Sequence, residues 1–233
     1  MSFAFEQLPL ALQLRDDHTF DNFYGGDNTL LLNQLQGQLN GGERYIYLYG
    51  SEGSGCTHLL QAACHQASSQ GLTSVYLPLA ELADYPPAQL FEGLEQLALV
   101  CIDELQAVAG DDLWEEALFH LFNRLERAGV ILLVAANSAV RTLPLALADL
   151  ASRLSWGTLY QLKPLADDQQ MQMLQFRAAQ RGLDISPEVA QFIVHRCQRR
   201  TPALVALLQD LDTASLKEQR RLTIPFVKSV MGW

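Results

Sequence analysis

Residues 45–57 read YIYLYGSEGSGCT, and the segment HLLQAACHQASSQ follows at once. Residues 45–49 are an apolar run of strand-forming side chains that ends at Gly50, and apolar periodicity resumes after Gly55. The stretch therefore predicts a strand, a glycine loop and a helix. Its G-x-x-x-x-G-x-T spacing matches the Walker A phosphate-binding pattern everywhere except at Cys56, where a lysine normally stands.

A loop of this kind holds phosphates because glycines let successive backbone N–H groups converge on phosphate oxygens. The helix that follows adds the positive end of its dipole, and the Thr57 hydroxyl is a candidate Mg²⁺ ligand. The alternative interpretation is a glycine-rich turn without a ligand. The candidate nucleotide-binding residues of this stretch are Gly50, Gly53, Ser54, Gly55, Cys56, Thr57 and His58.

The missing lysine limits what the site does. That lysine is a point charge on the β- and γ-phosphates, and a thiol does not replace it. We therefore expect the site to hold a nucleoside diphosphate such as ADP, and to turn over a triphosphate slowly or not at all. Whether the chain is itself an enzyme stays open. A rival interpretation makes Cys56 a low-pKa nucleophile at a helix N-terminus, but no arginine lies in the loop and nothing nearby marks a general base.

Residues 97–106, LALVCIDELQ, predict a fully buried parallel strand that runs into two carboxylates. Ligands of open α/β sheets bind at this end of the strands. Asp103 is the expected second Mg²⁺ ligand, and Glu104 is the catalytic candidate that orients an attacking water. Alternatively, the two acids merely end a strand. The next strand, VILLVAANS, presents Asn137 near the position of a γ-phosphate.

Three aromatic residues, Phe20, Phe23 and Tyr24, precede the phosphate loop within HTFDNFYGGDN. Aromatic side chains in this place either wall the base of a nucleotide or belong to the core, and the sequence does not decide between the two. At the start of the chain, FEQLPLALQL contains Pro9, which forbids a regular helix. We interpret it as an extended peptide that displays Gln7, Leu8 and Leu10 to an apolar groove of a partner, or alternatively as an arm packed on its own domain.

Composition excludes several classes of protein. The net charge is −10 among 233 residues, and a surface that binds DNA through its phosphates needs clustered Lys and Arg. Direct, sequence-specific DNA binding is therefore not expected. Four cysteines without C-x-x-C spacing and five histidines without metal spacing indicate neither a zinc site nor disulfides. No apolar run has membrane-spanning length and no signal peptide is apparent, so a cytoplasmic location is expected.

The element pattern predicts an α/β fold with a five-stranded parallel sheet and, after Pro164, a small all-α domain. Three amphipathic helices and a fourth short one are expected there. The predicted divisions are an N-terminal arm at residues 1–15, a nucleotide-binding α/β domain at 16–164 and a helical lid at 165–233.

In this order, the two phosphate-site motifs, the Asn137 position, the box DLASRLSWG and the helical lid resemble the AAA+ family. GSEGSGCTHLLQAA, HTFDNFYGGDN and LASRLSWG are similar to the corresponding motifs of DnaA, the bacterial replication initiator. The likeness covers about residues 16–220. Two features differ from DnaA: a clamp-type peptide precedes the core, and no helix-turn-helix domain follows the lid. With these features the chain resembles the DnaA-related regulators that act with the sliding clamp to inactivate the initiator.

The resemblance implies roles for individual residues. Residues Gln7, Leu8, Pro9 and Leu10 would bind the DNA sliding clamp, and Arg153 would act in trans as an arginine finger on ATP bound to DnaA. A surface salt bridge is the alternative for Arg153. The family's lid arginine aligns with Pro202, so that either Arg199 or Arg200 takes its place or the contact is missing.

The expected function is thus a nucleotide-bound regulator that represses re-initiation of DNA replication. Rival hypotheses are an AAA+ ATPase or helicase-loader-like motor that uses its own site, and a clamp-loader-type subunit that serves as scaffold. A homo-oligomer is possible because AAA+ interfaces are heterologous.

Overall fold

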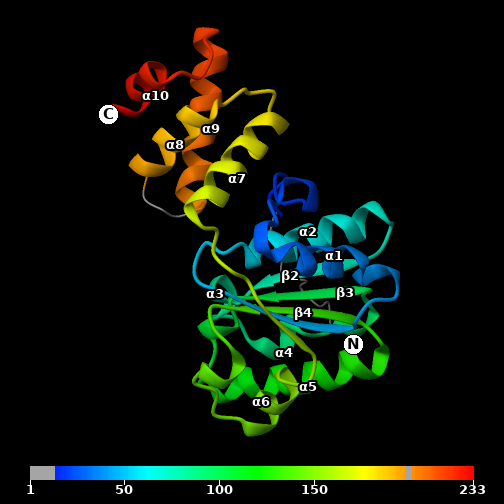
Figure 1. The fold of residues 1–233 in the computed structure, drawn as a ribbon. Helices are drawn as coiled ribbons and strands as arrows, with labels where there is room; N and C mark the ends of the chain where they lie inside the picture. The colour runs from blue at the N-terminus through cyan, green and yellow to red at the C-terminus, as the bar shows by residue number, and fades with distance from the viewer. Residues whose placement is uncertain (1–13, 198–200) are drawn as a thin grey trace, which may run out of the picture.

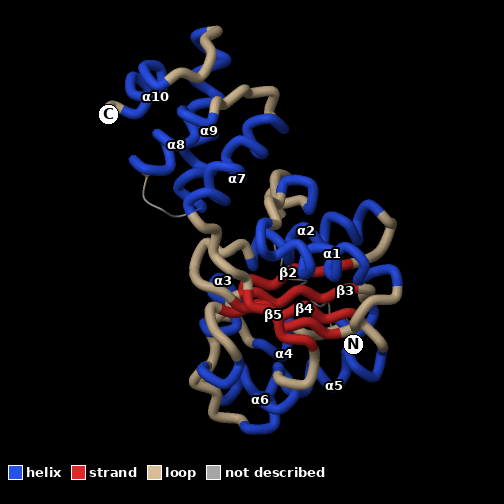
Figure 2. Tube along the Cα trace, viewed as in Figure 1, coloured by secondary structure: helices blue, strands red, loops and turns tan. Residues whose placement is uncertain are grey.

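The computed structural model describes residues 14–197 and 201–233. Its central element is a parallel sheet with the strand order β2-β3-β4-β1-β5 (Figures 1 and 2). The strands are β1 Tyr45–Tyr49, β2 Ser74–Pro78, β3 Leu99–Asp103, β4 Ile131–Ala136 and β5 Thr158–Gln161. The predicted fold class, a five-stranded parallel sheet followed by helices, is confirmed.

Ten α-helices lie within the described ranges. The first six are α1 Thr29–Gly37, α2 Cys56–Ser69, α3 Leu79–Leu82, α4 Pro87–Leu90, α5 Asp112–Ala128 and α6 Ala148–Leu154. The lid contains α7 Asp167–Gln180, α8 Pro187–Arg196, α9 Thr201–Glu218 and α10 Ile224–Met231. Short 3-10 turns occupy Phe20–Asn22, Gly26–Asn28, Gln38–Asn40, Leu94–Gln96, Leu105–Ala107 and Val140–Thr142. None of the described helices has the length and apolar character needed to cross a bilayer.

Helices cover both faces of the sheet (Figure 2). Along β1, Ile46 and Leu48 pack with α1 and α2 on one face, and Tyr47 packs with α5 and α6 on the other. Successive residues of a strand point to opposite faces, and all three side chains are buried because helices cover both faces. Coverage of both faces explains why the central strands β1, β3 and β4 appear in the sequence as continuous apolar runs.

The four lid helices bury an apolar cluster of their own, with Leu174, Ile193 and Leu208 at its centre. The linker that leads from β5 to this cluster is pinned by Asn28. Its side-chain amide donates to the Lys163 carbonyl at 3.1 Å and accepts from the Lys163 N–H at 2.9 Å. The buried Asn28 thus fixes the point at which the chain leaves the sheet for the lid.

A buried carboxylate on α5, that of Glu115, joins two loops. It accepts hydrogen bonds from the backbone N–H groups of Gly110 at 2.7 Å, Ala146 at 3.1 Å and Leu147 at 2.6 Å. Only 1% of Glu115 is exposed. The charge is tolerated in the core because three donors satisfy it. Glu115 therefore ties the chain after β3 to the start of α6.

We predict that Glu115→Ala lowers the free energy of unfolding by about 2–4 kcal/mol, because three backbone donors lose their acceptor. Urea titration of the purified chain measures the loss. Glu116→Ala is the matched control. The exposed Glu116 makes a surface contact of 3.7 Å with the exposed His120, and such pairs contribute about 0–1 kcal/mol. Equal losses in the two variants would contradict the assigned role of Glu115.

Candidate nucleotide site

The loop between β1 and α2 adopts a conformation that requires glycine at two positions. Gly53 has φ +78° and Gly55 has φ +106°, in the left-handed region that L side chains rarely occupy. A Cβ on Gly55 would lie 2.7 Å from the Phe23 ring, and one on Gly53 would lie 2.8 Å from the Pro202 ring. The loop is therefore packed between the segment that enters the domain and the first turn of α9.

A cavity of about 600 Å³ lies above this loop, and we call it the P-loop cavity. It brings together the two predicted metal ligands, Thr57 and Asp103, with Glu104 and Asn137. One hydroxyl and one carboxylate suit Mg²⁺, which keeps waters and takes its remaining ligands from phosphates. No cluster of three or more His, Cys, Asp or Glu side chains fit for a metal occurs among the described residues. This donor set therefore fits a metal that arrives with a nucleotide.

Both oxygens of Asp103 are engaged. Tyr76 donates its hydroxyl to Oδ2 at 2.8 Å, and the Glu104 N–H donates to Oδ1 at 2.9 Å. Glu104 itself has φ +58°, an uncommon value for a residue other than glycine. Partial burial, together with the charges of Asp103 and Glu81, raises the pKa of the Glu104 carboxyl. The backbone thus holds Glu104 at the edge of the cavity in a conformation that costs energy.

Cys56 is the first residue of α2, and it faces the P-loop cavity. Its Sγ lies 3.5 Å from the Ser54 Oγ. Burial raises the pKa of the Cys56 thiol to about 11, and the Asp103 charge acts in the same direction. The thiol is consequently neutral near pH 7. Cys56 thus supplies neither the positive charge of a lysine nor the thiolate of a nucleophile.

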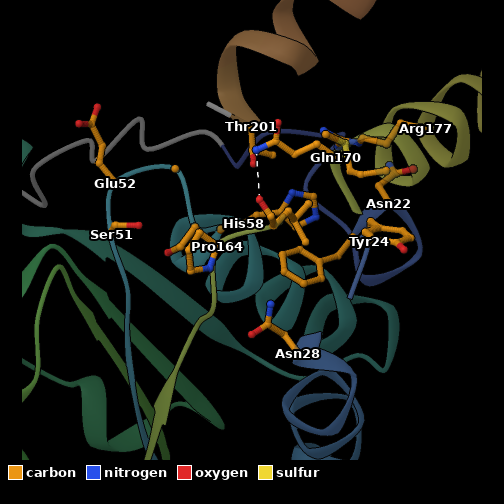
Figure 3. Close-up of a pocket in the computed structure, with 16 residues that line it drawn as sticks. Asn22, Tyr24, Asn28, Ser51, Glu52, His58, Pro164, Gln170, Arg177 and Thr201 are labelled. Carbon is orange, nitrogen blue, oxygen red and sulfur yellow. Dashed lines mark hydrogen bonds between the residues drawn. The ribbon is translucent and has the colours of Figure 1, made fainter. Parts of the chain in front are cut away.

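A second cavity of about 380 Å³, the aromatic cavity, adjoins the same loop (Figure 3). Phe23 and Tyr24 line it together with residues 51–55 of the loop, His58 and Pro164. Phe20 instead packs into the core beside α1 and α2 and lines neither cavity. Two of the three aromatic residues singled out in the sequence therefore face the cavity, and the third is a core residue.

His58 occupies the boundary between the two cavities, since it lines both of them. Its Nε2 lies 2.7 Å from the Thr19 carbonyl oxygen, and its ring stacks on His18 with centroids 4.6 Å apart. Burial lowers the pKa of His58 to about 4. The ring is therefore neutral at physiological pH and acts as a packed wall of the site.

The lid forms the roof of both cavities. Arg177 from α7 and Thr201 from α9 line both, and Pro202 lines the P-loop cavity. Helix α7 is also fixed to the entry segment, because the Gln169 amide donates to Asp27 at 2.8 Å and the Tyr24 hydroxyl donates to Gln172. The site is thus closed by residues that lie more than a hundred positions apart in the sequence.

Arg153, the predicted arginine finger, lines neither cavity. It lies near the end of α6, on the far side of the sheet from the lid (Figure 1). Its Nη1 is 3.5 Å from a Glu126 carboxylate oxygen, and its guanidinium lies 5.4 Å from the ring centroid of the exposed Trp156. Both charged side chains are more than a third exposed, so the ion pair is weak.

Some predicted and some unpredicted residues remain to be placed. Residues Gln7, Leu8, Pro9, Leu10, Arg199 and Arg200 lie outside the described part of the chain.

Sequence reasoning missed Arg177 and Gln170, which α7 presents to the site. They stand seven residues apart on the buried face that also carries Met173 and Leu174. Two polar side chains on an otherwise apolar helix face are the signal from which this surface was predictable.

We predict that His58 makes the protein sensitive to acid. Its folded pKa is depressed below the usual 6.5, so its contribution to stability is complete above pH 6.5 and is lost as the pH falls towards 4. Between pH 7 and pH 5 the wild type should lose about 1–2 kcal/mol more unfolding free energy than His58→Gln. Urea titrations at both pH values measure this difference. Replacement of the exposed His120 by Gln should leave the wild-type pH dependence intact, and parallel profiles for wild type and His58→Gln would refute the prediction.

Comparisons with known proteins agree with this geometry. Residues 14–161 match the bacterial DnaA ATPase domain, and residues 167–231 match the lid domain of Hda. Domain III of the Thermotoga maritima initiator DnaA superposes with a TM-score of 0.79 at 19% identity, over 94% of this chain and 98% of that one. DnaA from Aquifex aeolicus, bound to AMPPCP, gives 0.74 at 23% identity, over 88% and 70%.

A further structural neighbour is the Thermotoga maritima RuvB Holliday junction branch migration motor, with a TM-score of 0.67 at 16% identity, over 92% of this chain and 73% of that one. At these identities the solved structures show the fold alone. The family match is stronger, because it extends over more than half of the chain. The chain belongs to the bacterial DnaA ATPase-domain family of AAA+ proteins and carries a lid domain of the Hda type.

Proposed function

We propose that this chain is a regulator of DNA replication that binds a nucleoside diphosphate and promotes hydrolysis of the ATP bound to DnaA. In this proposal Arg153 enters the nucleotide site of DnaA, and a clamp-binding peptide holds the regulator on DNA. Loss of the ATP form of the initiator then represses re-initiation. The proposed parts are an arm at residues 1–15, a nucleotide-binding domain at 16–164 and a lid at 165–233, acting together in the cytoplasm.

The nucleotide has a defined place in this proposal. Thr57 and Asp103 would hold Mg²⁺, the loop around Gly53 and Gly55 would hold the phosphates, and the aromatic cavity would take the base. Asn137 lies in the P-loop cavity at the end of β4. The neutral thiol of Cys56 favours a diphosphate, because the charge that normally neutralises a γ-phosphate is missing. ADP is the proposed ligand, and it would act structurally, by holding lid and sheet together.

The position of Arg153 is the observation that carries the proposal. It is more than a third exposed and lies away from both cavities of its own chain. A guanidinium that cannot reach its own nucleotide is available to a neighbouring one. There it would stabilise charge on the transferring phosphoryl group, a contribution worth several orders of magnitude in rate.

The clamp supplies proximity in this scheme. A peptide containing Gln7, Leu8 and Leu10 would dock in an apolar groove of the clamp. Attachment to a clamp on DNA raises the effective concentration of the regulator near the initiator, so a modest contact between the two becomes productive. The net charge of −10 is consistent with a protein that reaches DNA through a partner.

The alternative function is an ATPase or loader subunit that works with its own site. The specific observation in its favour is Glu104, which the structure holds beside Asp103 at the P-loop cavity. A steady-state ATPase assay on the isolated chain separates the two functions. Brisk turnover that disappears in Glu104→Gln would favour the alternative.

We predict that Arg153→Ala abolishes stimulation of the DnaA ATPase, with a loss of at least about 100-fold, because the transition state loses its guanidinium. The assay measures ATP hydrolysis by DnaA with clamp-loaded DNA and added regulator. Arg153→Lys should recover little, since an ammonium lacks the planar fork. Replacement of the exposed Arg127 on the neighbouring α5 by Ala is the matched control. Full stimulation by Arg153→Ala would rule out the finger.

We also predict that removal of residues 1–12 abolishes binding to the clamp and leaves the folded domains intact. Co-elution with purified clamp measures binding, and the urea midpoint of the shortened chain measures folding. The substitution Gln7→Ala with Leu10→Ala in the full chain should have the same effect. Undiminished co-elution of both variants would dispose of the tethering peptide.

A further inference from the structure

The proposed phosphate site is short of positive charge. Cys56 is neutral, and at the position that the family resemblance gives to a lid arginine stands Pro202, whose ring packs over Gly53. Backbone N–H groups and the dipole of α2 contribute only partial charges. Arg15 also lines the P-loop cavity, but it is largely exposed and pairs with Asp17. Even with Mg²⁺ on Thr57 and Asp103, a buried cation close to the loop would therefore add to the binding of a diphosphate.

Arg177 on α7 is placed to provide that cation. Only 8% of the residue is exposed, yet it lines both the aromatic cavity and the P-loop cavity. The P-loop cavity contains Thr57 and Asp103 at its metal end, and the aromatic cavity contains Phe23 and Tyr24. Arg177 thus lies where the two cavities meet, beside loop residues 51–55, which also line both cavities and would hold the phosphates. Figure 3 shows Arg177 reaching from α7 towards the cavity beside Gln170.

The charge of Arg177 is poorly balanced within the chain. Its Nη2 is 3.9 Å from a carboxylate oxygen of Asp17, which is one-third exposed and also pairs with Arg15 at 3.3 Å. Burial lowers the pKa of Arg177, the Asp17 charge opposes this effect, and the nearby Arg181 and Arg15 add to it. Among the residues that the structure describes, this guanidinium has one long, shared ion pair, and it would gain from a second anion because charge-assisted hydrogen bonds are stronger than neutral ones.

The helix that carries Arg177 is already fixed in place. Gln169 and Gln172 on α7 bond to Asp27 and Tyr24 of the entry segment, and the Gln180 amide donates to the Asp21 carbonyl. These contacts flank Arg177 on both sides along the helix. The guanidinium is thus held near the site before a ligand arrives, which reduces the entropy lost on binding.

We propose that Arg177 binds the phosphates of the nucleotide and supplies, from the first lid helix, the cation that Cys56 and Pro202 do not. The inference rests on the proposed nucleotide site and adds to it a named phosphate ligand. Both domains would then contact the same ligand: the phosphates would bind the sheet domain through the loop and the lid through Arg177. Occupancy of the site would thereby stabilise one orientation of the lid.

The test compares two ligands by isothermal titration calorimetry on nucleotide-free full chain with Mg²⁺. Arg177→Gln should weaken ADP by about 10- to 100-fold and leave adenosine within about 2-fold of wild type, because only ADP carries the phosphates. Arg196→Gln, at the end of the lid helix α8, is the matched control, because the exposed Arg196 lines neither cavity, and it should bind both ligands as wild type does. Thermal melting without ligand checks that the variants fold alike.

Wild-type affinity of Arg177→Gln for ADP would overturn the inference alone, as would an equal loss for ADP and adenosine, which would assign Arg177 to lid packing. A wild-type chain that binds neither ligand would instead overturn the proposed nucleotide site, and this inference with it. Addition of Cys56→Lys to Arg177→Gln gives a second test. If the double variant binds ADP more tightly than Arg177→Gln does, the result supports Arg177 as a phosphate ligand. If Cys56→Lys raises the ADP affinity of the wild type but not that of Arg177→Gln, the result contradicts it.

Discussion

The Phe23 ring lies so close to the backbone of Gly55 that a side chain at position 55 would collide with it. This contact packs the segment that enters the domain directly on the phosphate loop. The same segment bonds on its other side to α7, through Tyr24 and Asp27. Loop, entry segment and lid therefore form one stack, and the shape of both cavities depends on it. A change in any layer alters the distance between the loop and the lid.

The parts of the site that follow from local sequence were predictable. An apolar run, a glycine spacing and two acids after a buried strand specify β1, the loop and Asp103 without knowledge of the rest, because parallel strands present their carboxyl ends at one edge. Arg177 was not predictable in this way. The polar positions on the buried face of α7 are visible in the sequence. The cavities that this face lines depend on how far the lid folds back over the loop, which is a tertiary property.

The aromatic residues illustrate the same limit. Phe20 and Phe23 are three positions apart in one short turn, yet Phe20 is a core residue and Phe23 lines a cavity. Both are apolar, and the sequence offers no reason to separate them. The close approach to Gly55 makes the distinction, and it appears only when the two segments meet. Glu115 is a comparable case, since its three backbone donors come from two loops that lie far apart in the sequence.

The two hydrogen bonds between the Asn28 side chain and the backbone of Lys163 restrict how the lid can move. Because both amide hydrogen bonds hold residue 163 to the sheet domain, any swing of the lid must begin beyond it, near Pro164. Helix α9 has 18 residues and so extends about 27 Å from the roof of the site. A rotation of the lid by about 10° at the inner end of α9 would move the outer end of this helix by about 5 Å. A rotation of the lid about this point would therefore displace the outer end of α9 much further than the residues beside the loop.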